Sequence, residues 1–150
     1  MSDFWSVIGS NPVRDADDVD AALERISSRL DVMTPNTLER FAEFLHEALF
    51  RIDRRELAEI PVYLSGLEFE QTSDHFQYAR CACILAGEKV YGEVLESGVG
   101  FGLFIAPATQ GAEGLLYLAS ETYERKTGER LNSQSFFPVD SMSNVQGWSD

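Results

Sequence analysis

The residues of this chain that could do chemistry are few, and histidine and cysteine are the scarcest. The chain has two histidines, His46 and His75, and two cysteines, Cys81 and Cys83. These four side chains could be imagined as a zinc set, but no recognisable ligand spacing supports it. A cysteine with His75 could form a nucleophilic dyad, yet both cysteines lie along an apolar helical pattern, which favours core packing. We therefore predict no catalytic residue, no metal site and no cofactor.

Other polar motifs are incomplete. Glu43 and His46 have the spacing used in di-iron helical bundles, but those sites need a second copy that this chain lacks. Ser65 is missing the glycine that precedes the serine of a nucleophile elbow. Glu70, Asp74 and His75 lie near one another in the sequence and could act in acid and base catalysis, although helix starts attract such residues for structural reasons.

A cationic cluster, Arg125, Lys126 and Arg130, stands out in a chain with a formal charge of −13. Gly128 is placed to end a helix, and cations in the last turn oppose the negative end of the helix dipole. Glu121 precedes Arg125 by four residues, the favoured orientation for an ion pair. The cluster is therefore predicted to be a helix ending.

The composition is that of a globular protein of 150 residues, with 44% hydrophobic and 25% charged residues. A pI near 4.4 argues against nucleic-acid binding, which needs clustered cations. No apolar run reaches the roughly 20 residues of a membrane helix, and the start "MSDFWSVIGS" does not resemble a secretion signal. We expect a cytoplasmic protein whose acidity either keeps it soluble or attracts a basic partner.

Apolar residues recur at helical spacing along most of the chain. One stripe runs over 19–33 and a second over 38–52, with Thr34 and Pro35 suited to the cap and first position of the second helix. Two helices joined by so short a link predict an antiparallel αα-hairpin. Further helices are expected at 2–8, where Phe4 and Trp5 would dock on the body, at 55–65 with a break at Pro61, and at 73–86, 90–95 and 110–126. The predicted fold is all-α, a compact bundle of about six helices.

One connection breaks this pattern. In Gly98–Pro107, glycine alternates with Val99, Phe101 and Leu103, a period of two that predicts an extended piece. The sequence does not decide whether this apolar connection belongs to the core or to an interface.

The C-terminal residues 132–150 differ in composition from the rest of the chain. Residues 1–131 are predicted to form one helical domain, and 132–150 an irregular tail packed on it. The tail is rich in serine and asparagine but contains Phe136, Phe137 and Trp148, which are costly to leave exposed.

Three stretches share an order and spacing typical of one family. They are Phe4-Trp5, the central set Ser73, Asp74, Phe76, Arg80, Gly87, Val90 and Tyr91, and the run Tyr123-Glu124-Arg125-Lys126-Thr127-Gly128. Over most of residues 3–131 the chain resembles a family of small bacterial, actinobacterial-type domains of unknown function. The resemblance implies fold and lineage without an activity. The chain departs from that family at Ala82, where the family has Trp, and in the connection before the last helix, so a function that depended on either would be altered here.

The resemblance also groups five residues, Asp74, Arg80, Tyr91, Tyr123 and Arg125, in one polar arrangement. In one interpretation they form a buried network that ties three helices together. In the other they line a pocket, where an arginine fork holds a carboxylate or phosphate.

Two functional hypotheses follow. The first is a non-enzymatic protein-binding module, one version of which neutralises a basic partner such as a toxin. Three observations motivate it: the sequence lacks a recognisable catalytic set, its charge is acidic, and it contains the apolar connection Gly98–Pro107. The second is a small-molecule or anion-binding pocket, or a minor enzyme, around Arg80, Tyr91, Tyr123 and Arg125.

Overall fold

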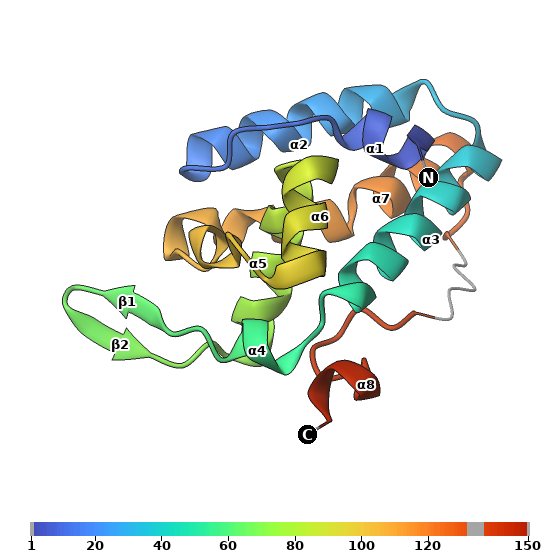
Figure 1. Ribbon diagram of the computed structural model, residues 1–150. Coiled ribbons are helices and arrows are strands. Elements are labelled where there is room, and N and C mark those ends of the chain that lie inside the picture. The colour runs from blue at the N-terminus through green and yellow to red at the C-terminus, as the bar shows by residue number, and fades with distance from the viewer. Residues whose placement is uncertain (1, 132–136, 150) are drawn as a thin grey trace.

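The computed structural model describes residues 2–131 and 137–149, and within them the chain is mostly helical (Figure 1). This confirms the predicted helical class. The elements, in chain order, are α1 (Ser2–Ile8), α2 (Ala16–Asp31), α3 (Pro35–Arg51), α4 (Arg55–Ala58), β1 (Val62–Leu64), β2 (Leu67–Phe69), α5 (Ser73–Leu85), α6 (Glu88–Ser97), the 3₁₀ helices η1 (Phe101–Phe104) and η2 (Pro107–Leu116), α7 (Leu118–Thr127) and α8 (Val145–Trp148).

Helix α5 forms the centre of the core. Its residues from Ala79 to Leu85 are all buried, as expected of a helix that is surrounded by other elements. It packs against α3, α6, η1 and η2. Helix α1 closes one end, where the Phe4 ring lies 5.0 Å from the Phe41 ring and the Trp5 ring 5.1 Å from the Tyr91 ring. The predicted docking of this short helix is confirmed.

The two helices of the predicted αα-hairpin and their local signals are present, but the helices pack little against each other. Thr34 caps α3 by accepting from the Thr37 amide, and Pro35 occupies the first helical position. However, α2 and α3 diverge from their link, and each packs against α7 (Figure 1). A short link brings two helix ends together but does not fix the angle at which the helices cross, because that angle depends on which side chains interlock.

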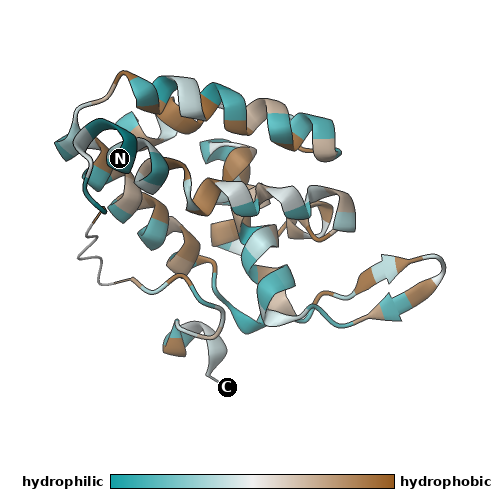
Figure 2. Cartoon of the chain, turned by 180° about the vertical axis from the view of Figure 1, so that it is seen from behind, coloured by the Kyte–Doolittle hydropathy of each residue, from teal (hydrophilic) through white to brown (hydrophobic). Residues whose placement is uncertain are grey.

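The segment after Pro61 is a β-hairpin, where a helix with a break was predicted. Helix α4 ends at Ala58, and β1 then pairs antiparallel with β2, with Val62 opposite Phe69 and Leu64 opposite Leu67. Ser65 and Gly66 join the strands with φ values of 54° and 79°. Two successive residues with positive φ form the turn that matches the twist of paired strands. The hairpin reaches out from the helices (Figures 1 and 2).

The connection Gly98–Pro107 is helical in part, and the extended piece predicted there is wrong. Phe101 and Phe104 are buried in η1, whereas Val99 and Leu103 are exposed. Burial three residues apart is the period of a 3₁₀ helix, so the glycine alternation did not indicate which side chains face inward. The segment thus contributes both to the core and to the surface.

The predicted helix over 110–126 is divided. Its first part belongs to η2, and α7 begins at Leu118. With α4 and α8 added, the described residues contain eight α-helices, more than the six or so that were predicted.

The described part of the tail, residues 137–149, lies against the helices. The Phe137 ring is 5.2 Å from the Phe50 ring, and the Trp148 ring is 6.2 Å from the Phe76 ring. The tail also contains a helical turn, α8, where an irregular course was expected. The prediction for Phe136 falls outside the described residues. None of the described helices combines the length and hydropathy needed to cross a bilayer.

Candidate functional site

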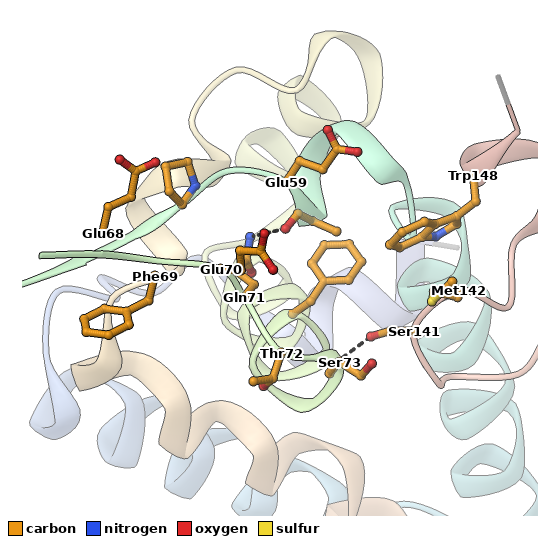
Figure 3. Close-up of a pocket in the computed structure, with 13 residues that line it drawn as sticks. Glu59, Glu68, Phe69, Glu70, Gln71, Thr72, Ser73, Ser141, Met142 and Trp148 are labelled. Carbon is orange, nitrogen blue, oxygen red and sulfur yellow. Dashed lines mark hydrogen bonds between the residues drawn. The ribbon is translucent and has the colours of Figure 1, made fainter.

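A cavity of about 750 Å³ lies at the base of the hairpin (Figure 3). It falls within the size range of ligand pockets. Its walls come from α4, β2, the start of α5 and the C-terminal segment 137–149. The lining contains three carboxylates and three aromatic rings, from Glu59, Glu68, Glu70, Phe69, Phe76 and Trp148. No lining residue is basic.

Gln71 fixes the base of the hairpin beside α4. Its Nε2 lies 2.9 Å from the Leu57 carbonyl oxygen, 3.2 Å from that of Ala58 and 2.9 Å from that of Ile60. These carbonyls lie at and just beyond the C-terminal end of α4, where carbonyl oxygens are not fully satisfied by a following helical turn. One side chain therefore satisfies the end of α4 and holds β2 at the cavity wall.

The start of α5 forms the cavity floor. Thr72 caps the helix, since its Oγ1 accepts from the His75 amide at 3.0 Å. The cap fixes where α5 begins and so directs Phe76, which is fully buried in its first turns, towards the cavity. The side chain of His75 makes a second contact in this turn: its ring nitrogen Nε2 lies 2.6 Å from the Ile105 carbonyl oxygen.

Asp53 holds the C-terminal wall in place. Its carboxylate is fully buried and accepts four hydrogen bonds from the C-terminal segment. Oδ1 accepts from the Met142 amide at 3.0 Å and from the Trp148 indole at 2.8 Å. Oδ2 accepts from the amides of Ser143 and Asn144 at 2.8 and 2.9 Å. Backbone amides in succession make a concave anion site, and here a carboxylate that lies two residues beyond α3 occupies it.

Arg80 supports the same wall from inside. Its side chain is fully buried, and Nη1 donates to the Leu49 carbonyl at 2.9 Å. Nη2 donates to the Val139 carbonyl at 3.0 Å and to Ser141 Oγ at 3.2 Å. The guanidinium carbon lies 4.7 Å from the centre of the Phe76 ring. Burial lowers the pKa of Arg80, and the nearby Asp53 carboxylate opposes that effect.

The five residues that the sequence grouped do not share one site. Arg80 and Tyr91 are close, because both donate to neighbouring carbonyls of α3: the Tyr91 hydroxyl donates to Ala48 at 2.7 Å. Burial raises the pKa of Tyr91, so it is a structural donor at neutral pH.

Tyr123 and Arg125 lie elsewhere, on α7. The Tyr123 hydroxyl donates to Glu39 Oε1 at 3.2 Å, and Arg125 forms an exposed ion pair with Asp31. Glu39 and Ala48 are nine residues apart on α3, which corresponds to about 13 Å of helix. Asp74 is exposed in the first turn of α5. None of the five lines the cavity.

The side chains considered for nucleophilic or metal chemistry are placed for packing. Cys81 and Cys83 are fully buried in α5, and burial raises the pKa of each thiol to about 12. A thiol with so high a pKa is a poor nucleophile at neutral pH, because the thiolate is the reactive form. Burial also lowers the pKa of His46. Within residues 2–131 and 137–149, no three histidine, cysteine or carboxylate side chains are grouped so as to hold a metal ion.

Sequence reasoning missed the cavity, and one signal could have found part of it. "VYLSGLEF" places a two-residue Ser-Gly turn between alternating apolar residues, which indicates a hairpin. Asp53 and Gln71 carry no comparable signal, since their partners lie far away along the chain or in irregular backbone.

The structure defines a mostly helical domain with one projecting hairpin and, beside it, an acidic, aromatic-lined cavity. The chain belongs to the family of proteins of unknown function designated DUF4240, whose model matches residues 1–125. The match ends before the C-terminal segment that forms one cavity wall. No curated protein and no solved structure matches the chain.

Proposed function

We propose that this domain is a non-enzymatic protein-binding module that docks on a basic partner through its β-hairpin. The observation that carries the proposal is the exposure of four large hydrophobic side chains on so small an element. Tyr63 is 69% exposed, Leu64 51%, Leu67 61% and Phe69 48%. Exposed apolar groups gathered on one element mark interaction sites.

The hairpin is also built to accept another strand. It is a two-stranded sheet without further neighbours among the described residues, so the outer edges of β1 and β2 offer unpaired backbone groups. Such edges bind extended segments by adding a strand. An isolated hairpin is marginally stable, and contact with a partner would stabilise it.

Charge favours a basic partner. From residue 56 to residue 79 the chain contains four glutamates and one aspartate, and neither lysine nor arginine. This run includes the whole hairpin and most of the cavity lining. A negative surface around an apolar contact selects a positively charged partner and speeds the encounter with it.

The test compares four proteins, the wild type and three variants, in pull-downs from native lysate at low and at moderate salt. The wild type and a Val32→Ser control, which alters an exposed apolar residue at the end of α2, should retain the same basic protein. A Leu64→Ser, Leu67→Ser double variant should lose it, and Glu68→Lys should weaken capture most at low salt. Recovery of no specific partner, or equal recovery by the double variant, would contradict the proposal.

Three further points remain proposals. The N-terminal and C-terminal signature stretches support a bacterial, actinobacterial-type lineage. The acidic composition supports a cytoplasmic location. The contacts of residues 137–149 support one domain over 1–131 with the tail packed on it.

A further inference from the structure

We propose that the cavity at the base of the hairpin binds a cationic side chain, arginine or lysine, presented by the basic partner. This inference rests on the proposed function and names the group that the partner inserts. The first reason is the combination of size and shape. The cavity is concave, has a volume of about 750 Å³ and lies next to the exposed face of the hairpin, so a strand docked on the hairpin could direct a side chain into it.

The second reason is the charge of the lining. Glu59, Glu68 and Glu70 contribute carboxylates, and no lysine, arginine or histidine lines the cavity. Arg80 lies over the Phe76 ring, but the buried Asp53 carboxylate is close enough to oppose its charge. Low-dielectric walls with carboxylates of one sign concentrate a negative potential. The lining therefore excludes anions and favours a cation.

The third reason is that the lining suits an organic cation better than a metal ion. The three glutamates come from the residue after α4, from β2 and from the segment after β2, and among the described residues no trio of potential ligands is close enough to hold a metal jointly. The lining also includes the rings of Phe69, Phe76 and Trp148, and in Figure 3 Trp148 lies on the opposite side of the cavity from Glu68 and Phe69. Aromatic faces attract ammonium and guanidinium groups, and apolar walls accommodate the methylene stem of arginine or lysine.

The C-terminal segment completes the site. Met142 and Trp148 line the cavity, and Asp53 accepts hydrogen bonds from the backbone of this segment and from the indole nitrogen of Trp148. The site thus depends on residues beyond the family match, which ends at residue 125. Binding should therefore be lost when this segment is released from Asp53.

The experiment titrates the full chain with the peptide acetyl-Ala-Leu-Arg-Leu-Ala-amide and with its citrulline counterpart, which has the same shape without the charge. The readout is the indole N–H signal of Trp148 in a ¹⁵N correlation spectrum. The chain has two tryptophans, so a Trp5→Phe variant assigns the two signals. We expect the arginine peptide to shift the Trp148 signal with a millimolar dissociation constant and the citrulline peptide to bind at least about tenfold more weakly.

Matched variants test the site itself. Glu70→Gln and Glu68→Gln should each weaken the arginine peptide several-fold, whereas Glu24→Gln, which alters an exposed residue of α2, should leave its affinity unchanged. No shift of the Trp148 signal at about 10 mM arginine peptide, ten times the expected dissociation constant, would overturn the inference. Equal binding of the citrulline peptide, or equal losses in all three variants, would also overturn it.

Failure of this inference can be told apart from failure of the proposed function. If the hairpin double variant loses the partner but Glu70→Gln retains it and the arginine peptide does not bind, the cavity proposal is wrong and hairpin docking stands. If the arginine peptide binds as expected but the double variant still captures the partner, hairpin docking is wrong and the cavity site stands.

Discussion

Replacing Asp53 by asparagine should release the C-terminal segment while the helical core remains folded. The substitution keeps the size and shape of the side chain. It removes the negative charge and exchanges one acceptor oxygen for a donor NH₂ group. That group would face either the amides of Ser143 and Asn144 or the donors of Met142 and Trp148.

The magnitude follows from the donors left without an acceptor. Each buried donor that loses its partner costs about 1–3 kcal/mol, so two of them cost about 2–6 kcal/mol. Because 1.4 kcal/mol corresponds to a factor of ten, the docking equilibrium of the segment should shift by a factor between about 30 and about 2 × 10⁴. The observed change cannot exceed the docking free energy of the segment, since beyond that point the segment simply detaches.

Amide hydrogen exchange measures this shift directly. The amides of Met142, Ser143 and Asn144 should lose protection by that factor, while amides in the centre of α5 keep theirs. The far-UV circular dichroism should change little, because most helical residues lie outside the segment. Asp140→Asn is the control: it makes the same chemical change at an exposed position of the same segment.

The reasoning would be refuted if the three amides kept their protection in Asp53→Asn, or if Asp140→Asn had the same effect. Loss of protection throughout α5 would also contradict it, because it would mean that Asp53 stabilises the whole core and not one segment.

Three further outcomes are expected. Arg80→Gln should lower the free energy of unfolding by about 3 kcal/mol or more, since it removes three hydrogen bonds from a buried charge. Arg125→Gln breaks an exposed ion pair and should lower the free energy of unfolding by less than about 1 kcal/mol. Equal losses of free energy for the two arginine variants in urea unfolding would contradict this contrast. Gly66→Ala and Gly87→Ala both place a side chain at positive φ, which should lower the free energy of unfolding by roughly 1–2 kcal/mol in each case. A Cβ at position 87 would also lie within 2.9 Å of atoms in the loop after α1, whereas a Cβ at position 66 meets nothing within 4 Å. Thermal melts should therefore rank Gly87→Ala as much the less stable. Finally, the two cysteines of α5, whose pKa burial raises from 9.0 to about 12, should react with a thiol reagent at pH 8 about a thousandfold more slowly in the native than in the unfolded protein; similar rates would show that they are accessible.

Helices with a strong apolar period were predictable because their signals are local. The stripe from Val19, the cap at Thr34 and the proline at position 35 all act within a few residues of one another, and the structure confirms the cap and the first turn of α3. The C-terminal end of α7 is of the same kind, since Gly128 terminates it with φ of 75°.

Where local signals compete, the prediction was wrong. The alternation around Phe101 indicated a strand, but two left-handed glycines and the burial of Phe104 produce a 3₁₀ turn. Around Pro61 the apolar spacing indicated a helix, yet the Ser-Gly turn and the strands that pair across it prevailed. A short segment that fits two patterns is decided by what it packs against.

The candidate site was largely beyond prediction. Arg80 and Arg125 look alike in the sequence, but the first is buried between α3 and the C-terminal segment and the second pairs with Asp31 at the surface. Asp53 is one of 25 acidic residues, and nothing near it in the sequence indicates that it accepts four hydrogen bonds from residues 142–148.

By itself, the sequence determined the helical class, the positions of the main helices and the acidic charge of the chain. The tertiary structure alone decided how α2 and α3 diverge, which arginine is buried, and how the hairpin, α5 and the C-terminal segment enclose one cavity. The physical reason is the range of the forces involved. Backbone propensity, capping and helical periodicity act between residues a few positions apart, whereas burial and the pairing of buried polar groups depend on residues that meet only when the whole chain has folded.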